Sequence, residues 1–219
     1  MDDGVRTEKK NKCILICAGD LEIAEIPEKR EGDLVIAVDG GYLYCQALGI
    51  EPDVVIGDFD SLGEDNRAQI GSGQRMISLN PVKDDTDTLA ALRLGLAEGY
   101  REFHLYGALG GRLEHTLANL QCLLFLKKEG AAAYIWDSCS MITLIENESL
   151  TFREDMEGML SVFAIGGTAE GVGEKGLRYR LDQAVLTEAF PVGISNEFIG
   201  EQAEVSVKKG ALLVIVRWA

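Results

Sequence analysis

Short apolar segments alternate with helix-forming segments through the first 136 residues, and this alternation constrains the fold more than any other feature of the chain. Each apolar segment has the length of a buried strand and is too short for a helix. Strands that alternate with helices indicate a mostly parallel sheet with helices on both faces. The predicted strands cover residues 12–18, 34–39, 54–57, 75–79, 102–106 and 132–136.

Helix-type patterns fill the stretches between these strands. A short one runs to residue 48 and a weaker one covers residues 64–70, while longer ones cover residues 89–98 and 113–129. In the first of the longer helices, Leu89, Leu92 and Leu96 share one face at helical spacing. This part of the chain is therefore predicted to be a doubly wound α/β fold.

The pattern changes after residue 137. Short β-type segments follow at residues 141–145, 159–165, 203–207 and 211–218, and no helix pattern accompanies them. Lys208-Lys209-Gly210, between the last two segments, has the composition of a hairpin turn. We therefore expect two domains, an α/β domain over residues 1–138 and an all-β, sandwich-like domain over residues 139–219.

Composition excludes several classes of protein. The formal net charge of −15 argues against a general nucleic-acid-binding protein, because such proteins neutralise phosphates with clustered Lys and Arg. The polar N-terminal residues lead into no long apolar run, so we expect neither a secretory signal nor a membrane span. The five cysteines form no Cys-x-x-Cys pair. This usage predicts no zinc site or disulfide framework and favours a cytoplasmic location.

The segment at residues 54–62 reads VVIGDFDSL, an apolar strand that runs into a turn with two carboxylates. On an extended backbone the side chains of Asp58 and Asp60 would project the same way. Two carboxylates that close repel each other unless a cation or a proton intervenes, which indicates a divalent-metal site. Asp and Ser are also common in solvated turns, so the motif alone leaves both interpretations open.

Other acidic residues follow predicted strands or begin predicted helices. The carboxyl ends of parallel strands meet at one edge of a sheet, where α/β folds hold their ligands, so these residues can converge on one site. Oxygen ligands suit Mg²⁺, which is usually completed by waters and substrate phosphates. Helix capping explains one or two of these residues but not all of the positions together. The acidic positions are Asp39, Asp58, Asp60, Asp84, Asp85 and Asp87.

A glycine-rich loop at residues 107–116, GALGGRLEHT, precedes the helix predicted over residues 113–129. Glycines let backbone N–H groups approach a phosphate, and the helix start adds its positive end. Arg112 can add a bidentate phosphate contact, and His115 can touch the nucleotide or the substrate. An ordinary loop with positive φ angles at Gly110 or Gly111 is the alternative.

Two further features have no expected role in binding or catalysis. The sequence GVGEKG at residues 171–176 matches the dinucleotide-binding pattern G-x-G-x-x-G, but no helix follows it, so we expect a flexible loop there. His104 lies within a predicted strand and is expected to be a packed core residue. Two histidines placed in this way argue against a Ser-His-Asp hydrolase.

Taken together and in order, several motifs resemble those of the thiamine pyrophosphokinase family. They are Asp39-Gly40-Gly41, GDFDSL, KDDTDT and GALGGRLEHTLANL, followed in the β region by GLRYRL and GISNEF. The resemblance spans nearly the whole chain, and the combination of GDFDS with KDDTD is specific.

The resemblance implies an α/β domain joined to a β-sandwich domain in a homodimer, with thiamine bound between the α/β domain of one subunit and the β domain of the other. It implies Mg²⁺-dependent transfer of a pyrophosphoryl group from ATP to the thiamine hydroxyl, with release of AMP. By position in the matched motifs, the residues implied at the catalytic centre are Asp58, Asp60 and Asp87 as Mg²⁺ ligands with Asp39 close by, Lys83 and Arg112 as phosphate contacts, and Ser195 and Asn196 as thiamine contacts.

One turn departs from the family pattern, and two other functions also match some of the motifs. The first strand ends in Ala18-Gly19-Asp20, which is less glycine-rich than this turn often is in the family, and Trp218 is the candidate aromatic partner for thiamine. A haloacid-dehalogenase-like phosphatase also uses an Asp-x-Asp after a strand, here Asp58 and Asp60. A thiamine- or nucleotide-binding protein without turnover is the non-enzymatic alternative.

Overall fold

A computed structural model describes residues 11–21, 29–59, 74–80 and 85–218 of the chain. Parallel strands in the order β4-β3-β2-β1-β5-β6 form one half of a continuous sheet. These strands are β1 (Cys13–Ile16), β2 (Leu34–Val38), β3 (Val54–Gly57), β4 (Arg75–Ser78), β5 (Glu102–Tyr106) and β6 (Ala132–Trp136). All six lie where the alternation of apolar and helical segments predicts them.

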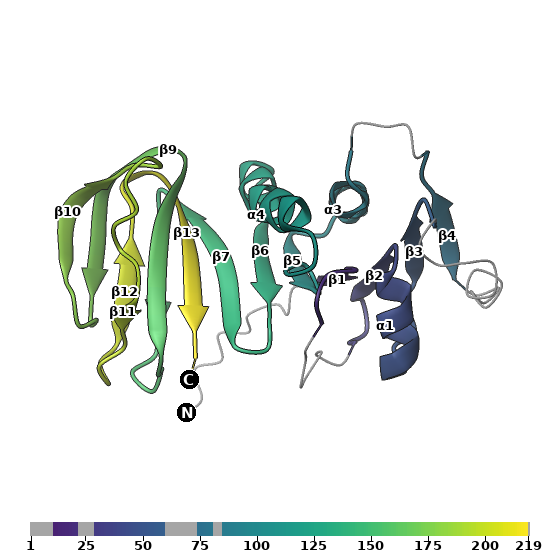
Figure 1. The fold of residues 1–219 in the computed structure, drawn as a ribbon, viewed down its shortest axis with the longest axis horizontal. Helices are drawn as coiled ribbons and strands as arrows, with labels where there is room; N and C mark the ends of the chain where they lie inside the picture. Colours follow the sequence, from purple (N-terminus) through teal and green to yellow (C-terminus); the bar gives the residue numbers. More distant parts are fainter. Residues whose placement is uncertain (1–10, 22–28, 60–73, 81–84, 219) are drawn as a thin grey trace, which may run out of the picture.

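Helices cover both faces of this half of the sheet, as predicted. They are α1 (Gly41–Leu48), α3 (Asp87–Ala97) and α4 (Leu113–Lys128). Figure 1 shows α3 and α4 on one side of the strands and α1 on the other. The helix predicted over residues 64–70 lies outside the described residues.

Alternate residues of the same strand supply the cores on the two faces. Cys13 and Leu15 of β1 belong to the apolar cluster beneath α3 and α4, whereas Ile14 and Ile16 belong to the cluster beneath α1. All four side chains are at most 2% exposed. A strand that is buried on both faces reads as an unbroken apolar run, and this explains the sequence CILI.

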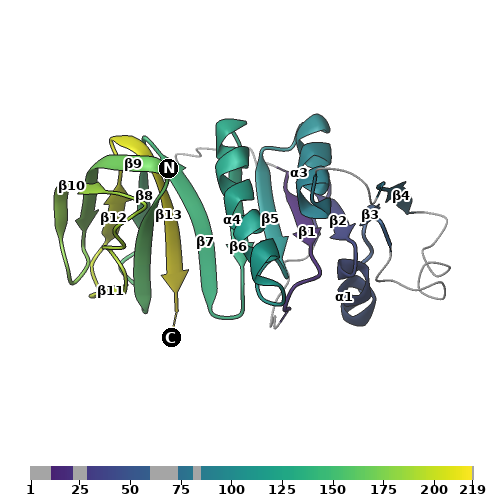
Figure 2. The same ribbon diagram turned by 45° about the horizontal axis from the view of Figure 1, so that its top comes forward.

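The second half of the sheet is antiparallel and begins directly after β6, which pairs with β7. Its strands are β7 (Ser140–Glu146), β8 (Ser149–Phe152), β9 (Met159–Lys175), β10 (Leu181–Leu186), β11 (Asn196–Glu197), β12 (Ala203–Ser206) and β13 (Lys209–Arg217). Figure 2 shows the sheet running from β4 at one end of the molecule to β10 at the other. The predicted fold class, a parallel α/β part followed by an all-β part, is confirmed.

The long strand β9 organises the all-β part. Its first half pairs with β13, and its second half pairs with β10 on one side and β12 on the other. Side chains from both halves, such as Leu160 and Val172, belong to one apolar cluster. The strands therefore enclose a second core of their own.

Two local predictions for this part are wrong. The turn at Lys208-Lys209-Gly210 does not close a hairpin, because β13 pairs with β7 and β9 while β12 pairs with β8 and β9. GVGEKG is not a flexible loop, because its residues 171–175 form the end of β9. Composition describes a turn or a glycine-rich segment, but only tertiary pairing decides which strand lies beside it. The strands β8, β10 and β11 were also not predicted.

The boundary expected at residues 138/139 stays a prediction, and it falls within the connection between β6 and β7. Ile142 and Leu144 of β7 and Leu213 of β13 belong to the same apolar cluster as α3 and α4. One core therefore spans the predicted boundary. Among the described helices, none is long and apolar enough to cross a membrane.

Candidate functional site at the topological switch point

The strand order places a crevice between β1 and β5. From β1 the chain adds β2, β3 and β4 on one side, whereas β5 and β6 extend the sheet on the other side. At such a reversal the connections after neighbouring strands leave in opposite directions, and ligands bind at the carboxyl ends of the strands. A cavity of about 540 Å³ lies at this point.

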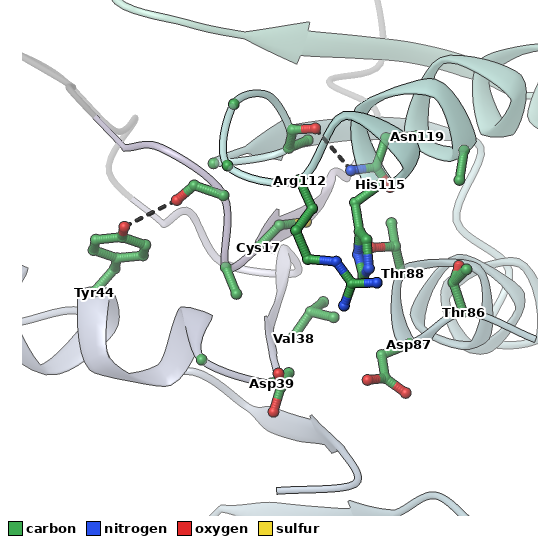
Figure 3. A pocket seen from close by; sticks show the side chains of 18 of the residues that line it. Cys17, Val38, Asp39, Tyr44, Thr86, Asp87, Thr88, Arg112, His115 and Asn119 are labelled. Carbon is green, nitrogen blue, oxygen red and sulfur yellow. Dashed lines mark hydrogen bonds between the residues drawn. The ribbon is translucent and has the colours of Figure 1, made fainter. Parts of the chain in front are cut away.

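The cavity collects residues from widely separated parts of the chain. Figure 3 shows Arg112 and His115 on one side of it and the carboxylates of Asp39 and Asp87 on another. Its lining comes from the segments after β1, β2 and β5 and from the beginnings of α1, α3 and α4. Of the predicted site residues, Asp39, Asp87, Gly110, Gly111, Arg112 and His115 line the cavity.

The glycine-rich loop forms one wall of the cavity. Gly110 and Gly111 adopt φ angles of 76° and 59°, a left-handed conformation that glycine adopts without strain. The Asp20 carboxylate accepts a hydrogen bond from the Gly111 backbone N–H at 3.2 Å, and a Cβ added at Gly110 would lie 2.1 Å from Oδ2 of Asp20. The loop is therefore held against the turn that follows β1.

Asn119 and Tyr44 support this wall and were missed by sequence reasoning. The buried Asn119 side chain donates a hydrogen bond from Nδ2 to the Ala108 carbonyl at 2.7 Å, which ties α4 to the loop. The Tyr44 hydroxyl donates to the Gly19 carbonyl at 2.9 Å. A signal for Asn119 was present, because it is a polar residue inside the apolar run of α4.

The basic side of the cavity is built at the start of α4. Arg112 donates from Nε to Oε1 of Glu114 at 2.7 Å, and both side chains are exposed. A hydrogen bond from its own backbone N–H, and after that the bond from Arg112, lowers the pKa of Glu114. This pairing orients Arg112 and leaves its terminal nitrogens available for a phosphate at the positive end of the helix.

The acidic side is built from the ends of β2 and α3. Asp39 has a φ of 48° and donates its N–H to the Ile56 carbonyl at 2.8 Å, so it lies beside the end of β3. Asp87 is the first residue of α3, whose N-cap Thr86 accepts a hydrogen bond from the Leu89 N–H at 3.2 Å. Thr86 therefore caps the helix, and Asp87 lies in its first turn, beside the positive end of the helix.

The backbone after β3 is not extended as the alternation argument assumed. Phe59 has a φ of 63°, and its side chain is 4% exposed within the core beneath α1. Burial of this ring stabilises a left-handed residue at a position where the sequence implied a continuing strand. Asp58 follows β3 directly, at the edge of the sheet where Asp39 lies.

Four predicted acidic or basic positions have other outcomes. Asp60, Lys83 and Asp84 lie outside the described residues. Asp85 forms an ion pair with Arg93 of α3. Burial raises the pKa of Cys17, which lines the cavity, to about 12, so this thiol stays protonated at neutral pH and is a poor nucleophile.

The predicted thiamine contacts lie elsewhere in the chain. Ser195 and Asn196 belong to the segment of β11, which pairs with β9, so β6, β7, β13 and β9 separate them from β5 in the sheet. Figures 1 and 2 both show β11 on the far side of β7 from the helices. A single chain does not bring these residues to the cavity.

Trp218 belongs to a row of aromatic side chains near the β6–β7 connection. Its ring centroid lies 6.4 Å from that of Trp136, and its Nε1 donates to the Ser138 carbonyl at 3.2 Å. Trp136 stacks on His104 at 5.9 Å and donates from Nε1 to its Nδ1 at 2.9 Å. His104 is 6% exposed, so its prediction as a packed core residue is confirmed.

The oxygen donors at the cavity fit a divalent cation such as Mg²⁺. Within the described ranges no three His, Cys, Asp or Glu residues gather as a complete metal-binding group. Mg²⁺ is commonly held by one or two carboxylates and completed by substrate phosphates and waters. Asp39 and Asp87 supply two carboxylates on the cavity wall.

Comparison with known protein families agrees with this geometry. Residues 28–135 match the model described as thiamin pyrophosphokinase, catalytic domain, and residues 139–212 match the model described as thiamin pyrophosphokinase, vitamin B1 binding domain. The two matched regions are adjacent and together cover most of the chain. The chain belongs to the thiamin pyrophosphokinase family.

Individual family members resemble it over most of its length. Thiamine pyrophosphokinase from Bacillus subtilis (strain 168) is 28% identical over 187 residues, which cover 84% of this chain and 87% of the relative. A crystal structure of thiamine pyrophosphokinase from Bacillus subtilis superimposes with a TM-score of 0.85 at 25% identity, covering 95% of this chain and 99% of the other. The enzyme from Geobacillus thermodenitrificans gives a TM-score of 0.81 at 26% identity, with coverages of 95% and 98%.

Proposed function

We propose that this protein transfers the pyrophosphoryl group of ATP to the hydroxyl of thiamine and releases AMP. The observation that carries the proposal is the cavity at the switch point, where a basic glycine-rich loop faces carboxylates within a chain of this family. In the reaction, the thiamine hydroxyl oxygen bonds to the β-phosphorus of ATP while the bond from that phosphorus to the α,β-bridging oxygen breaks. AMP leaves with that oxygen, and a carboxylate accepts the hydroxyl proton.

The side chains have separate parts in this reaction. Arg112 and the N–H groups of the glycine-rich loop bind phosphate oxygens, helped by the positive end of α4. His115 lines the same cavity, and we place it next to the bound nucleotide. Phosphoryl-type transfer asks the protein mainly for positioning and charge neutralisation, and these residues provide both.

We propose that Asp58, Asp60 and Asp87 hold Mg²⁺, with Asp39 close by, and that Lys83 contacts the phosphates. Support comes from Asp87 and Asp39 on the cavity wall and from Asp58 at the adjoining strand end. Bound Mg²⁺ would neutralise the charge that develops on the transferred phosphates.

We also propose a homodimer in which the segment of Ser195 and Asn196, together with Trp218, lines a thiamine site over the cavity of the other subunit. The separation of β11 from the cavity within one chain supports this arrangement, in which the thiamine contacts and the cavity come from different copies of the chain. The cytoplasm is the proposed location, which the five free cysteines favour.

The reaction is tested by incubating the protein with Mg²⁺, ATP and thiamine and measuring AMP, ADP and both thiamine phosphates. Equal amounts of AMP and thiamine diphosphate are expected. ADP with thiamine monophosphate would contradict one-step transfer, and phosphate release from phosphomonoesters without a thiamine product would favour a phosphatase.

The shared site is tested by complementation. We expect Asp87→Asn and Ser195→Lys to be inactive alone, since the lysine places a positive charge against the cationic thiazolium ring. Mixed dimers contain one intact site when cavity and thiamine contacts come from different subunits, so co-expression restores about a quarter of wild-type activity. Activity of the co-expressed pair no higher than that of either variant would contradict a site shared between subunits.

A further inference from the structure

The two motifs of the all-β part, GLRYRL and GISNEF, form one hydrogen-bonded unit. Leu177 bridges to Phe198, and the Arg178 N–H donates to the Glu197 carbonyl at 3.0 Å. Arg178 also pairs through its guanidinium with the Glu197 carboxylate at 3.1 Å. Segments about twenty residues apart in sequence are thus held side by side.

The Asn196 side chain fastens this unit from within. Its Oδ1 accepts from the backbone N–H groups of Tyr179 and Glu197 at 2.9 and 3.0 Å. Its Nδ2 donates to the Tyr179 carbonyl and to Oε2 of Glu174, both at 2.6 Å. All four hydrogen-bonding positions of the amide are thereby used, and the side chain is 3% exposed. Asn196 has nothing left to offer a ligand directly.

Glu174 is an unusual partner for this amide. It lies in β9, is 1% exposed, and burial raises its pKa, an effect that the Asn196 hydrogen bond opposes. Its Oε1 is buried without a hydrogen-bond partner among the described residues. A buried polar atom without a partner is costly, and apolar residues of similar size in place of both Glu174 and Asn196 would avoid that cost. Stability alone therefore does not account for a carboxyl group here.

The surface above this pair carries Ser195 and Tyr179. Ser195 is exposed, has a φ of 58°, and donates its N–H to Oγ of Ser161 at 3.0 Å. Tyr179, whose N–H and C=O are both bound by Asn196, leaves its side chain 62% exposed. The buried amide thus sets the backbone position of both exposed side chains.

We propose that Glu174 and Asn196 are positioning residues for thiamine, which act by holding the Ser195 and Tyr179 segments in place rather than by touching the vitamin. The inference rests on the proposed function, because it takes thiamine to bind at Ser195. The pair lies far from the switch-point cavity, so it acts on thiamine and not on ATP.

The decisive variant is Glu174→Met, which keeps the volume but removes the acceptor for Asn196. We expect the thermal midpoint to fall modestly, because loss of the unpartnered carboxyl oxygen offsets only part of the cost of leaving one Asn196 N–H without an acceptor. We expect KM for thiamine to rise about fivefold or more while KM for ATP stays within about twofold. Glu204→Met, at a half-buried position of the adjoining strand β12 where the carboxylate pairs with Lys175, is the matched control and should leave both KM values unchanged.

A second variant, Asn196→Asp, keeps both acceptor bonds and removes both donor bonds. It should also raise KM for thiamine selectively, by about tenfold. Asn147→Asp serves as its control. Oδ1 of Asn147 accepts a hydrogen bond from the Gly210 N–H at 2.9 Å, at the beginning of β13, and aspartate keeps this acceptor. This control should retain wild-type KM for thiamine.

The outcomes distinguish a failure of the proposed reaction from a failure of the positioning role of Glu174 and Asn196. A wild-type protein that forms no thiamine diphosphate would overturn the proposed function and this inference with it. An active wild type with thiamine KM within about twofold in both folded variants would overturn the inference alone. Loss of folding in both variants would show a purely structural role and would also overturn it.

Discussion

At the scale of single residues, the carboxylates on the cavity wall are the first to test. Asp87→Asn keeps the size of the side chain and removes its charge, so charge neutralisation at the phosphates is lost and kcat for AMP formation should fall by about a hundredfold or more. The loss of a negative charge in the first turn of α3 should cost only about 0.3–1 kcal/mol of stability.

The control for this variant is Asp155→Asn, which removes a more exposed carboxylate that pairs with Arg153 in the all-β part. It should leave kcat unchanged. A near-normal kcat in Asp87→Asn would remove Asp87 from the catalytic centre.

Gly110 offers a second test at this scale, because its backbone and its neighbour both exclude a side chain. Gly110→Ala places a methyl group against Asp20 at a φ of 76° and should raise KM for ATP about tenfold through displacement of the loop. Gly111→Ala has open space around its Cβ and should show only the backbone cost of about 1 kcal/mol in urea unfolding.

The double variant Asp20→Ala/Gly110→Ala distinguishes the two causes for Gly110. If the contact with Asp20 causes the loss, part of the affinity for ATP should return in the double variant. An unchanged KM for ATP in Gly110→Ala itself would show that the loop does not bind the nucleotide.

At the scale of elements, His104 joins β5 to β6 and makes the packing of these strands sensitive to pH. Trp136 donates to Nδ1, so the proton of the neutral ring is on Nε2, which faces Oε1 of Glu102 at 3.0 Å. Desolvation lowers the pKa of His104 from 6.5, although Glu102 opposes this shift and Lys12 adds to it.

The direction of the pH effect follows from this lowered pKa. As pH falls below 6.5, the unfolded chain takes up a proton before the folded chain does, so stability is lost from that pH down to the folded pKa. Urea unfolding between about pH 7.5 and pH 5.5 should show a larger loss for the wild type than for His104→Gln. Parallel curves for the two proteins would contradict the lowered pKa.

At the scale of the whole molecule, the two halves of the sheet share a core. Leu123 and Leu126 of α4 belong to the same cluster as Ile142 of β7 and Leu213 of β13. A fragment of residues 1–138 would expose this apolar face of α4, so we expect it to aggregate or to lack a cooperative transition, while the full chain unfolds in one. Two separate transitions, or a folded fragment with dispersed NMR signals, would contradict a shared core.

Local pattern was sufficient for much of the fold. Strands buried on both faces, such as CILI in β1, are recognisable as unbroken apolar runs, because every side chain packs into one of the two cores. The antiparallel part was harder to predict, because its pairing depends on where the long β9 bends. The tight turn at Lys208-Lys209-Gly210 therefore indicated a hairpin that does not form.

The sequence by itself determined the fold class, the family motifs and the convergence of Asp39, Asp87 and the glycine-rich loop, because parallel strands deliver their carboxyl ends to one edge. Only the tertiary structure decided the left-handed Phe59, the Asn119 and Tyr44 supports, and the buried bond between Glu174 and Asn196. Each of these depends on a contact between residues far apart in the chain, or on burial in a core, which spacing and composition do not encode.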